Sequence, residues 1–587
     1  MVSPPRLMDD VDSVQAQISR TMLTSGDWVT ARIDGVAYLE KSPLNYWMVG
    51  GVFRILGVHD WAARIPGVLS AIALALVTCA FGIWAFGKRA GLYAGLCIST
   101  CVGLFLFTRI LIPDVTLTLT ITLAMWSFLR VLDPEEPHPR AWAAVMAASI
   151  GTGLLLKSLV ALVFPVAAAL IYLAVTRQIF SWDVWKRLRP FSGIAIALLI
   201  AAPWHILATV RNPPFFAFTL HSGPGEYHGF LWFYFINEQL LRFLNLRYPR
   251  DYNTVPRLYF WLLHLVWLFP WSVYFPAVAR LSFRPVDRAG RARLLALCWT
   301  GFLLVFFTFS TTQEYYSMPC YPALALLLGS AMAAGGDWVR WGTRALAGLA
   351  GVAALACIAL LVKVWNVPTP GDISVALVAH PKAYKLSMGH IGDLTITSFA
   401  YLRLPLAVAA VGFLVGMLGN MRATGRRAFL SAAVMMVIFF HAARLALVDF
   451  DPFLSSHPLA EALLRSPSGR LIMNAQYYMF SSVIFYTDQN ALLLNGRINN
   501  IVYGSYAPGA PDVFLDDEQF KKMWNQPERA YILSYNYKIA HLESVVGADR
   551  LITVANSGGK SLLTNVPLTE MPSASIQSPP VEPHETP

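Results

Sequence analysis

Charged residues are scarce in this chain: Asp, Glu, Lys and Arg make up 13% of its 587 residues, whereas hydrophobic residues make up 56%. A soluble globular domain carries about a quarter charged residues, so this composition excludes an ordinary soluble protein and predicts one that crosses a membrane many times. The net charge of +11 does not come from a single basic patch. Basic residues recur between apolar segments, as in polytopic membrane proteins, and we therefore expect no nucleic-acid partner.

Cysteine is also scarce, and the polar C-terminal part of the sequence has none. The six cysteines lie in or beside apolar segments and are Cys79, Cys97, Cys101, Cys298, Cys320 and Cys357. This distribution argues against a disulfide framework and against a CxxC metal site, and we expect packing roles instead. The sequence also lacks a P-loop, a dinucleotide fingerprint and repeats of the solenoid type.

Long apolar segments dominate what is present. Twelve of them approach the length of about 20 residues that a helix needs to span a bilayer; they are roughly 66–87, 90–108, 113–132, 140–158, 159–177, 189–209, 257–277, 292–310, 316–335, 343–363, 399–418 and 427–447. The sequence therefore predicts an all-α polytopic membrane bundle of about twelve spans.

The basic loops predict how this bundle is oriented. Lys and Arg gather near residues 88–89, 177–189, 280–293 and 422–427, and an even number of predicted spans separates these loops. The positive-inside rule is satisfied if all four are cytoplasmic. Residues 1–65 and the region after 447 then face outward, away from the cytoplasm. Because residues 1–65 carry no signal peptide or preceding span to take them across, we expect a first span upstream of Met1 in the full gene product. An N-terminal tail that is translocated after synthesis is the alternative.

The pattern divides the chain into four parts. Residues 1–65 are predicted to form an outer loop with interfacial helices at ISRTML and 44–57, and residues 66–447 form the bundle. Residues 448–567 are predicted to form a small α/β domain outside the membrane, with strands at VIFYTD, ALLLNG and AYILSY and a helix at DDEQFKKMWN. The tail at 568–587, rich in Pro, Ser and Glu, is predicted to be disordered.

Ionisable residues at the outer membrane face are the candidate site residues, because charges at membrane depth are costly. Asp114 opens a predicted span, five residues after Arg109. It could bind or deprotonate an acceptor, or it could serve only as a favourable acid in a first helical turn. Lys157, between two predicted spans, could bind phosphate or extend to the interface.

The outer loops supply further candidates. Asp9, Asp10 and Asp12 could act chemically or form a solvated acidic run. Lys41 could bind phosphate or pair with Glu40. In the stretch 235–256, Glu238, Arg242 and Arg247 are expected near the membrane surface, where a guanidinium suits a lipid phosphate, although interfacial anchoring is the alternative. Tyr316 is a candidate substrate contact or part of an interfacial aromatic belt.

The order of these motifs resembles the polyprenyl-phosphate-sugar-dependent membrane glycosyltransferases of the GT-C fold, in the branch of the lipid A aminoarabinose transferase and the protein O-mannosyltransferases. The resemblance rests on SGDWVTARIDGVAYLEKSPLNYW, RILIPDVTLTL, LLLKSLVALVFP, AAPWHI and FINEQLLRFLNLRYP. It implies that Asp10, with Asp12 and Asp9 behind it, and Asp114 are the catalytic acids. It also implies that Lys41 and Arg242 bind the donor phosphate.

Three departures from the family pattern bear on function. The family's first span is missing, and the histidine of its E-H-x-x-R-F pattern is Gln239, which puts a metal bound with Glu40 in doubt. The lysine of its K-x-P-H/Y-Y motif is lost at residues 313–316. No required cofactor is evident, although a divalent metal stays a possibility. The sugar and the acceptor, whether lipid, glycan or protein hydroxyl, are left open.

The sequence thus predicts an inverting hexosyl- or pentosyltransferase that moves a sugar from a polyprenyl-phosphate donor to an acceptor outside the cytoplasm. The resemblance implies an enzyme of a bacterial inner membrane whose active site and C-terminal domain face the periplasm. Such an enzyme would serve the cell envelope, by lipopolysaccharide modification or protein glycosylation. A flippase for lipid-linked sugars is the alternative, but a transporter places its ionisable residues near the bilayer midplane, often with repeat symmetry. An inactive family member is a third possibility.

Overall fold

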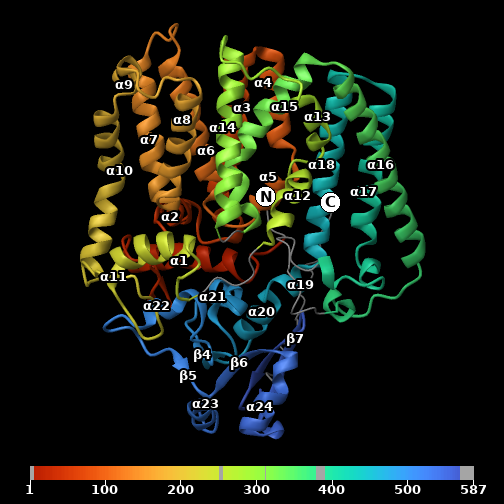
Figure 1. The fold of residues 1–587 in the computed structure, drawn as a ribbon. Coiled ribbons are helices and arrows are strands. Elements are labelled where there is room, and N and C mark those ends of the chain that lie inside the picture. Colours follow the sequence, from red (N-terminus) through yellow and green to blue (C-terminus); the bar gives the residue numbers. More distant parts are fainter. Residues whose placement is uncertain (1–4, 250–254, 311–312, 379–390, 569–587) are drawn as a thin grey trace, which may run out of the picture.

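The computed structural model describes residues 5–249, 255–310, 313–378 and 391–568. It shows a tall helical bundle standing on a smaller domain that contains a sheet, with the first segment of the chain between them (Figure 1). The bundle helices are α3 (Asp60–Phe86), α4 (Lys88–Ser99), α5 (Val102–Phe107), α6 (Asp114–Leu132), α7 (Pro139–Lys157), α8 (Val160–Val175), α9 (Trp182–Leu188), α10 (Pro190–Arg211), α12 (Arg257–Trp267), α13 (Phe275–Val278), α14 (Arg288–Phe309), α15 (Tyr321–Ala334), α16 (Asp337–Val364), α17 (Arg403–Arg422) and α18 (Arg426–Asp449).

Within the described ranges, nine helices are long and apolar enough to cross a membrane, or ten if the bent pair α12 and Trp271–Val278 forms one span. Each of the twelve predicted segments contains helix, but the count of twelve is not confirmed. The segment 90–108 is divided between α4 and α5, and α8 has only 16 residues. The all-α bundle with a small sheet domain is confirmed.

Small residues allow the bundle helices to pack closely. A Cβ added at Gly91 of α4 would lie 2.3 Å from the backbone nitrogen of Ile83 in α3, and one at Gly329 of α15 would lie 2.6 Å from the Ala90 carbonyl. Only glycine fits at such crossings, which is typical of helix packing in membranes.

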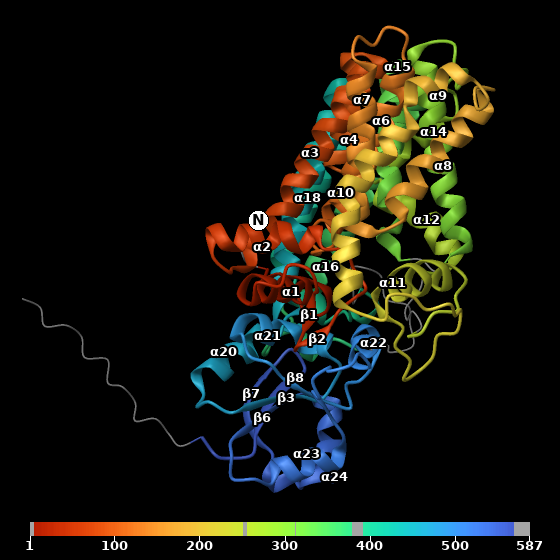
Figure 2. The same ribbon diagram turned by 90° about the vertical axis from the view of Figure 1, so that its left-hand side faces the viewer.

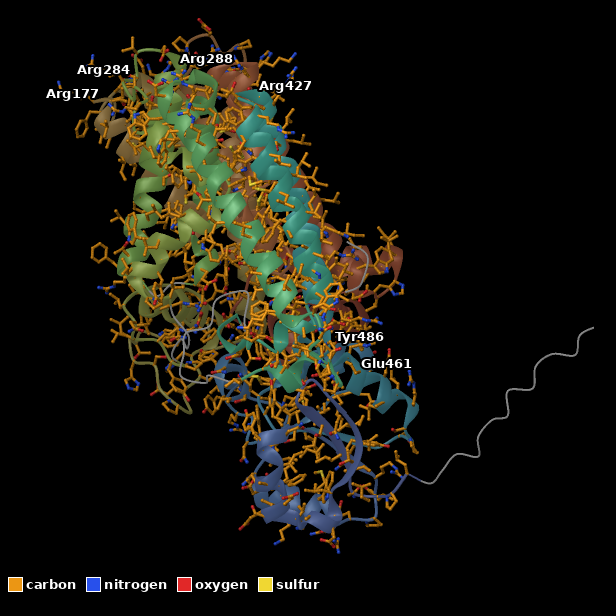
Figure 3. All side chains as sticks on the ribbon, turned by 90° about the vertical axis from the view of Figure 1, so that its right-hand side faces the viewer. Arg177, Arg284, Arg288, Arg427, Glu461 and Tyr486 are labelled. Carbon is orange, nitrogen blue, oxygen red and sulfur yellow. The ribbon has the colours of Figure 1, made fainter. Side chains whose placement is uncertain are left out.

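The basic loops lie at one end of the bundle. Arg177, Arg284, Arg288 and Arg427 are at the end away from the sheet, whereas Glu461 and Tyr486 lie near the sheet domain (Figure 3). This arrangement agrees with the orientation that the positive-inside rule predicted from the sequence.

The first segment lies across the other end of the bundle as α1 (Val11–Ser25), a hairpin of β1 (Arg32–Ile33) and β2 (Val36–Ala37), and α2 (Leu44–Leu56). The hairpin turn is Asp34-Gly35, and both residues have positive φ, as a two-residue turn of this kind requires. The helices predicted at ISRTML and 44–57 are confirmed as parts of α1 and α2. Figure 2 shows α1 and the hairpin between the bundle and the sheet.

The C-terminal domain is built around a six-stranded sheet in the order β5-β4-β3-β6-β8-β7. Its strands are β3 (Arg470–Met473), β4 (Leu492–Leu494), β5 (Phe514–Leu515), β6 (Ala530–Tyr535), β7 (Ile552–Ser557) and β8 (Lys560–Thr564), and its helices are α19 (Asp451–Leu454), α20 (His457–Arg465), α21 (Ser481–Thr487), α22 (Val502–Ser505), α23 (Asp517–Trp524) and α24 (Ile539–Val546). β3 to β6 are parallel, and β8 pairs antiparallel with β6 and β7. The predicted strand VIFYTD is wrong, because its first five residues lie in α21 and Asp488 caps that helix.

The two faces of the sheet pack on different partners because successive side chains of a strand point to opposite sides. Leu471 and Leu533 face the first segment and join a core with Val14 of α1. Ile472 and Ile532 face the other side and pack with helices α23 and α24. The sheet therefore fixes the first segment against the end of the bundle. The predicted tail at 568–587 lies outside the described residues except for Leu568.

Candidate functional site

A chain of charged side chains lies where the first segment meets the end of the bundle. Lys41 Nζ is 2.5 Å from Glu40 Oε1, and Glu40 Oε1 is 4.0 Å from Arg242 Nη1. Arg242 Nη1 lies 3.2 Å from Glu238 Oε2, which is 2.6 Å from Arg247 Nη1. Five of the residues singled out in the sequence are thus joined by direct contacts.

Tyr316 links these five residues to a second ion pair, between Lys157 and Asp114. Arg242 Nη2 donates to the Tyr316 hydroxyl at 3.0 Å, and Lys157 Nζ lies 4.5 Å from the centre of the Tyr316 ring. Lys157 Nζ in turn donates to Asp114 Oδ1 at 2.6 Å. We call the eight residues the charge cluster: Glu40, Lys41, Asp114, Lys157, Glu238, Arg242, Arg247 and Tyr316.

Local structure presents these side chains. Asp114 is in the first turn of α6, and Lys157 ends α7, where Ser158 breaks the helix with φ 60°. Glu238 lies in a π-helix, η1 (Trp232–Leu241), and Arg242 follows it directly. π-helical segments are rare and frequently occur at functional sites.

The cluster contains four cations and three carboxylates, and these differ in exposure. The carboxylates are buried, with exposed side-chain fractions of 5% for Glu40 and 2% for Asp114, whereas Lys41 is 30% exposed. Arg242 and Lys157 are 20% and 21% exposed. Lys41, Arg242 and Lys157 therefore reach open space while the acids lie behind them, and such a surface suits an anion with several oxygens. Arg247, at 7% exposed, stays behind this surface.

Glu40 and Lys41 are both charged at neutral pH. Burial alone would raise the pKa of Glu40, but Lys41, Arg247 and Arg242 outweigh burial and hold this pKa at about 2. The same pairing raises the pKa of Lys41 above its ordinary value, although burial opposes it. Glu40 therefore carries no proton near pH 7 and cannot act as a general acid there.

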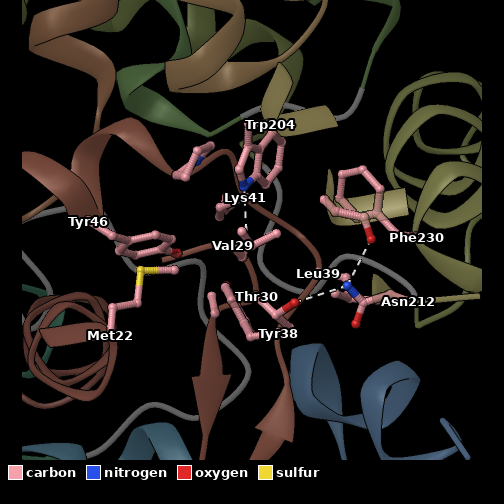
Figure 4. A pocket seen from close by; sticks show the side chains of 13 residues that line it. Met22, Val29, Thr30, Tyr38, Leu39, Lys41, Tyr46, Trp204, Asn212 and Phe230 are labelled. Atoms are coloured by element: carbon pink, nitrogen blue, oxygen red, sulfur yellow. Dashed lines mark hydrogen bonds between the residues drawn. The ribbon is translucent and has the colours of Figure 1, made fainter. Parts of the chain in front are cut away.

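A recess of about 260 Å³, open mouth included, adjoins Lys41. Figure 4 shows it between the first segment and the α10–η1 region, lined by aromatic rings such as Tyr46, Trp204 and Phe230. Its wall is tied together by two hydrogen bonds: Trp204 Nε1 donates to the Val29 carbonyl and Asn212 Nδ2 donates to Thr30 Oγ1.

The acids of the first loop do not contact the charge cluster directly. Asp9 accepts hydrogen bonds from the C-terminal domain, and Asp12 Oδ1 accepts from Leu111 N at 2.9 Å. Arg109 lies over the Phe105 ring, 4.6 Å from its centre. Asp10 is exposed. Sequence patterns gave no means of separating these four residues from the cluster.

Sequence reasoning missed two tyrosines behind Glu40. Tyr38 donates to Glu40 Oε2 at 3.2 Å, and Tyr478 of the C-terminal domain donates to the Tyr38 hydroxyl at 3.0 Å. Tyr38 stands two residues before Glu40 in the quoted motif and could have been found there. No local pattern distinguishes Tyr478.

No group of three or more His, Cys, Asp or Glu side chains that could hold a metal occurs in the described ranges. Glu40 and Glu238 are each paired with cations, and the neighbour of Glu238 is Gln239.

Comparison with solved structures identifies the fold. The crystal structure of ArnT from Cupriavidus metallidurans bound to undecaprenyl phosphate superposes with a TM-score of 0.75 and 24% sequence identity, covering 96% of this chain and 94% of that one. Its apo structure gives a TM-score of 0.74. The chain is therefore a polytopic membrane protein with the GT-C fold that the motifs predicted.

Sequence relatives narrow this class. The family model for dolichyl-phosphate-mannose-protein mannosyltransferase matches residues 40–207. The chain is 28% identical over 323 residues to the undecaprenyl phosphate-alpha-4-amino-4-deoxy-L-arabinose arabinosyl transferase of Pectobacterium carotovorum strain PC1, over 54% of this chain and 53% of that protein. It is 27% identical over 379 residues to the Aeromonas salmonicida enzyme of the same name, over 62% and 64%. The chain thus matches about half the length of the Pectobacterium relative.

Proposed function

We propose that this protein transfers a sugar from a polyprenyl-phosphate donor to an acceptor at the end of the bundle that carries the C-terminal domain. The observation that supports this most directly is the charge cluster. Its exposed cations, Lys41, Arg242 and Lys157, lie in front of buried carboxylates, and such cations suit the negative charge of a phosphodiester. The leaving phosphate gains a second charge as the bond to the sugar breaks, and preorganised cations stabilise developing charge of this kind.

The names of the relatives suggest the substrate. A pentose such as 4-amino-4-deoxy-L-arabinose on undecaprenyl phosphate is the donor that we propose, with a lipid, glycan or protein hydroxyl or another nucleophile of the envelope as acceptor. Lys41, Arg242 and Lys157 hold the phosphate, with Arg247 supporting Arg242 through Glu238. Asp10 acts as general base, and Asp114 orients Lys157.

We further propose that the reaction inverts the anomeric centre, since a base on the acceptor side favours direct displacement of the phosphate. The cations replace a metal in holding the phosphate, because Glu40 and Glu238 are already paired. The basic loops at the opposite end of the bundle support an orientation in a bacterial inner membrane in which that end faces the cytoplasm and the cluster and the C-terminal domain face the periplasm.

Release of undecaprenyl phosphate tests the proposal. Membranes containing the full chain receive undecaprenyl phosphate-alpha-4-amino-4-deoxy-L-arabinose, with their own envelope lipids as acceptors and with or without EDTA. We expect release by the wild type in both conditions and a loss of about 10-fold or more for Arg242→Gln, which removes a charge-assisted contact. Lys186→Gln, at the basic end of the bundle, is the matched control. A β-linked product by NMR would show inversion. Equal release by Arg242→Gln and the control would refute the assigned role.

A further inference from the structure

The C-terminal domain holds the N-terminal turn at Asp9-Asp10 by hydrogen bonds. Asp9 Oδ1 accepts from Ser482 N at 3.0 Å and from Ser482 Oγ at 2.7 Å. Asp9 Oδ2 accepts from Ser456 Oγ at 2.6 Å and from Lys560 Nζ at 2.7 Å. Four donors thus satisfy one carboxylate, and the Lys560 side chain is only 3% exposed. A buried ion pair that is fully hydrogen-bonded holds its geometry firmly.

The backbone of the turn is held at the next residue too. Asp10 N donates to the Tyr478 carbonyl at 2.7 Å, and Ser481 Oγ donates to the Asp10 carbonyl at 3.2 Å. Asp10 has φ 74°, a conformation that residues other than glycine rarely adopt. Such a conformation persists only where the surroundings over-determine it. The contacts therefore leave the Asp10 carboxylate exposed while its backbone is fixed on both sides.

The same part of the C-terminal domain reaches the charge cluster. Tyr478 holds Asp10 through its backbone carbonyl, and its hydroxyl donates to Tyr38, which donates to Glu40. Asn500 Nδ2 donates to the Tyr478 hydroxyl at 3.3 Å. One residue of the C-terminal domain thus connects the acid turn with the ion pair of Glu40 and Lys41.

We propose that the C-terminal domain positions the transfer machinery: Lys560 and Ser482, through Asp9, and Tyr478, through its backbone and its hydroxyl, set Asp10 relative to the Glu40–Lys41 pair. These are positioning residues, since each acts through another side chain. The proposal rests on the proposed function and goes beyond it, because it gives the C-terminal domain a role in positioning the active-site residues.

The charges around Asp10 supply a readout that loosened packing would not mimic. Asp10 keeps an open surface, but the protein around it displaces much of the bulk water. This desolvation, and then the charges of Asp12 and Asp9, raise the pKa of Asp10 to about 7. The other titratable groups facing this turn are Tyr478, Tyr535 of β6 and Lys560 of β8. Removing the Asp9 charge should therefore lower the pKa of Asp10, whereas removing Lys560 leaves Asp9 uncompensated and should raise it.

The experiment compares Asp9→Asn, Lys560→Met and the double variant, in which both charges are absent and the pair is neutral. Asp488→Asn is the matched control, because Arg20 and Asp488 form a second ion pair, at 2.8 Å, between α1 and the C-terminal domain. Release of undecaprenyl phosphate is measured against donor concentration and against pH in membranes with the full chain.

We expect kcat to fall about 10- to 100-fold in Asp9→Asn and Lys560→Met, as for a displaced catalytic group, with KM for the donor unchanged. The acidic limb of the pH profile should move down in Asp9→Asn and up in Lys560→Met. The double variant leaves no buried charge unpaired. Its kcat should stay as low as in the single variants, and the acidic limb of its pH profile should move to lower pH. Asp488→Asn should behave as the wild type.

Two results overturn the inference in different ways. If the wild type releases no undecaprenyl phosphate, the proposed function itself fails. If the wild type is active and Asp10→Asn is inactive, but the double variant matches Asp488→Asn in kcat and in its pH limb, the positioning role fails while the proposed function stands.

Discussion

Replacing Lys41 with Met removes the most exposed cation of the charge cluster and keeps most of the side chain's apolar length. A charge-assisted hydrogen bond to a phosphate oxygen is worth about 1.5–3 kcal/mol. The Coulomb attraction of unit charges at about 4 Å is about 4 kcal/mol where the effective dielectric constant is about 20, which sets an upper bound. We therefore expect kcat/KM for the donor to fall about 10- to 150-fold, using about 1.4 kcal/mol per tenfold change.

The choice of control variants depends on the residues that contact Lys41. Lys41→Met alone leaves Glu40 with Arg242 at 4.0 Å and the Tyr38 hydroxyl at 3.2 Å, so a loss of folding could imitate a loss of binding. Glu40→Gln/Lys41→Met removes both charges together and separates the two effects. Lys88→Met, at the start of α4 in the basic end, controls for the loss of a surface lysine.

The assay combines donor titration with binding of undecaprenyl phosphate to the purified protein. The double variant should keep the elution volume of the wild type in gel filtration and bind undecaprenyl phosphate about 10-fold or more weakly. If it binds and turns over the donor as Lys88→Met does, Lys41 does not hold the phosphate, and the charge argument for the cluster is refuted.

Two further predictions concern the contact between the first segment and the sheet domain. Burial, opposed by a hydrogen bond from Ala491 N, raises the pKa of Asp34 to about 7, so the folded state loses stability as pH rises from about 4 to about 7, by up to about 4 kcal/mol. Asp34→Asn should raise the melting temperature at pH 8 and have little effect at pH 4.5, and equal shifts at both pH values would contradict this. A Cβ at Gly504 would lie 1.8 Å from the Ala37 carbonyl, so Gly504→Ala should destabilise the protein by about 1–3 kcal/mol. Gly51→Ala, which meets nothing within 4 Å, should not, and similar melting temperatures for the two variants would count against this packing.

The lengths of the apolar segments and the charges of the loops were enough to predict the bundle, because each span is formed by one continuous stretch of sequence. They failed where a helix is interrupted: Thr100 and Cys101 separate α4 from α5 inside an unbroken apolar run. VIFYTD has the β-branched and aromatic residues of a strand, but tertiary packing makes it a helix, α21.

The candidate residues and their common membrane face were predicted from the sequence, but the contacts between them were not. Lys41, Arg242, Lys157 and Asp114 come from distant segments, and only the fold shows that they form one chain of contacts. The tie between Tyr38 and Tyr478 joins residues 440 positions apart. No spacing rule reaches across such a separation, so the sheet domain's contribution could come only from the structure.

The contact between Asp9 and Lys560 joins residues 551 positions apart, and this separation sets an order of events during biosynthesis. The first segment leaves the ribosome early, but the lysine that fixes it lies on β8, the last strand to be made. Closing so long a loop is entropically costly until the sheet around β8 has folded. We therefore expect the acid turn to be fixed only when synthesis is nearly complete.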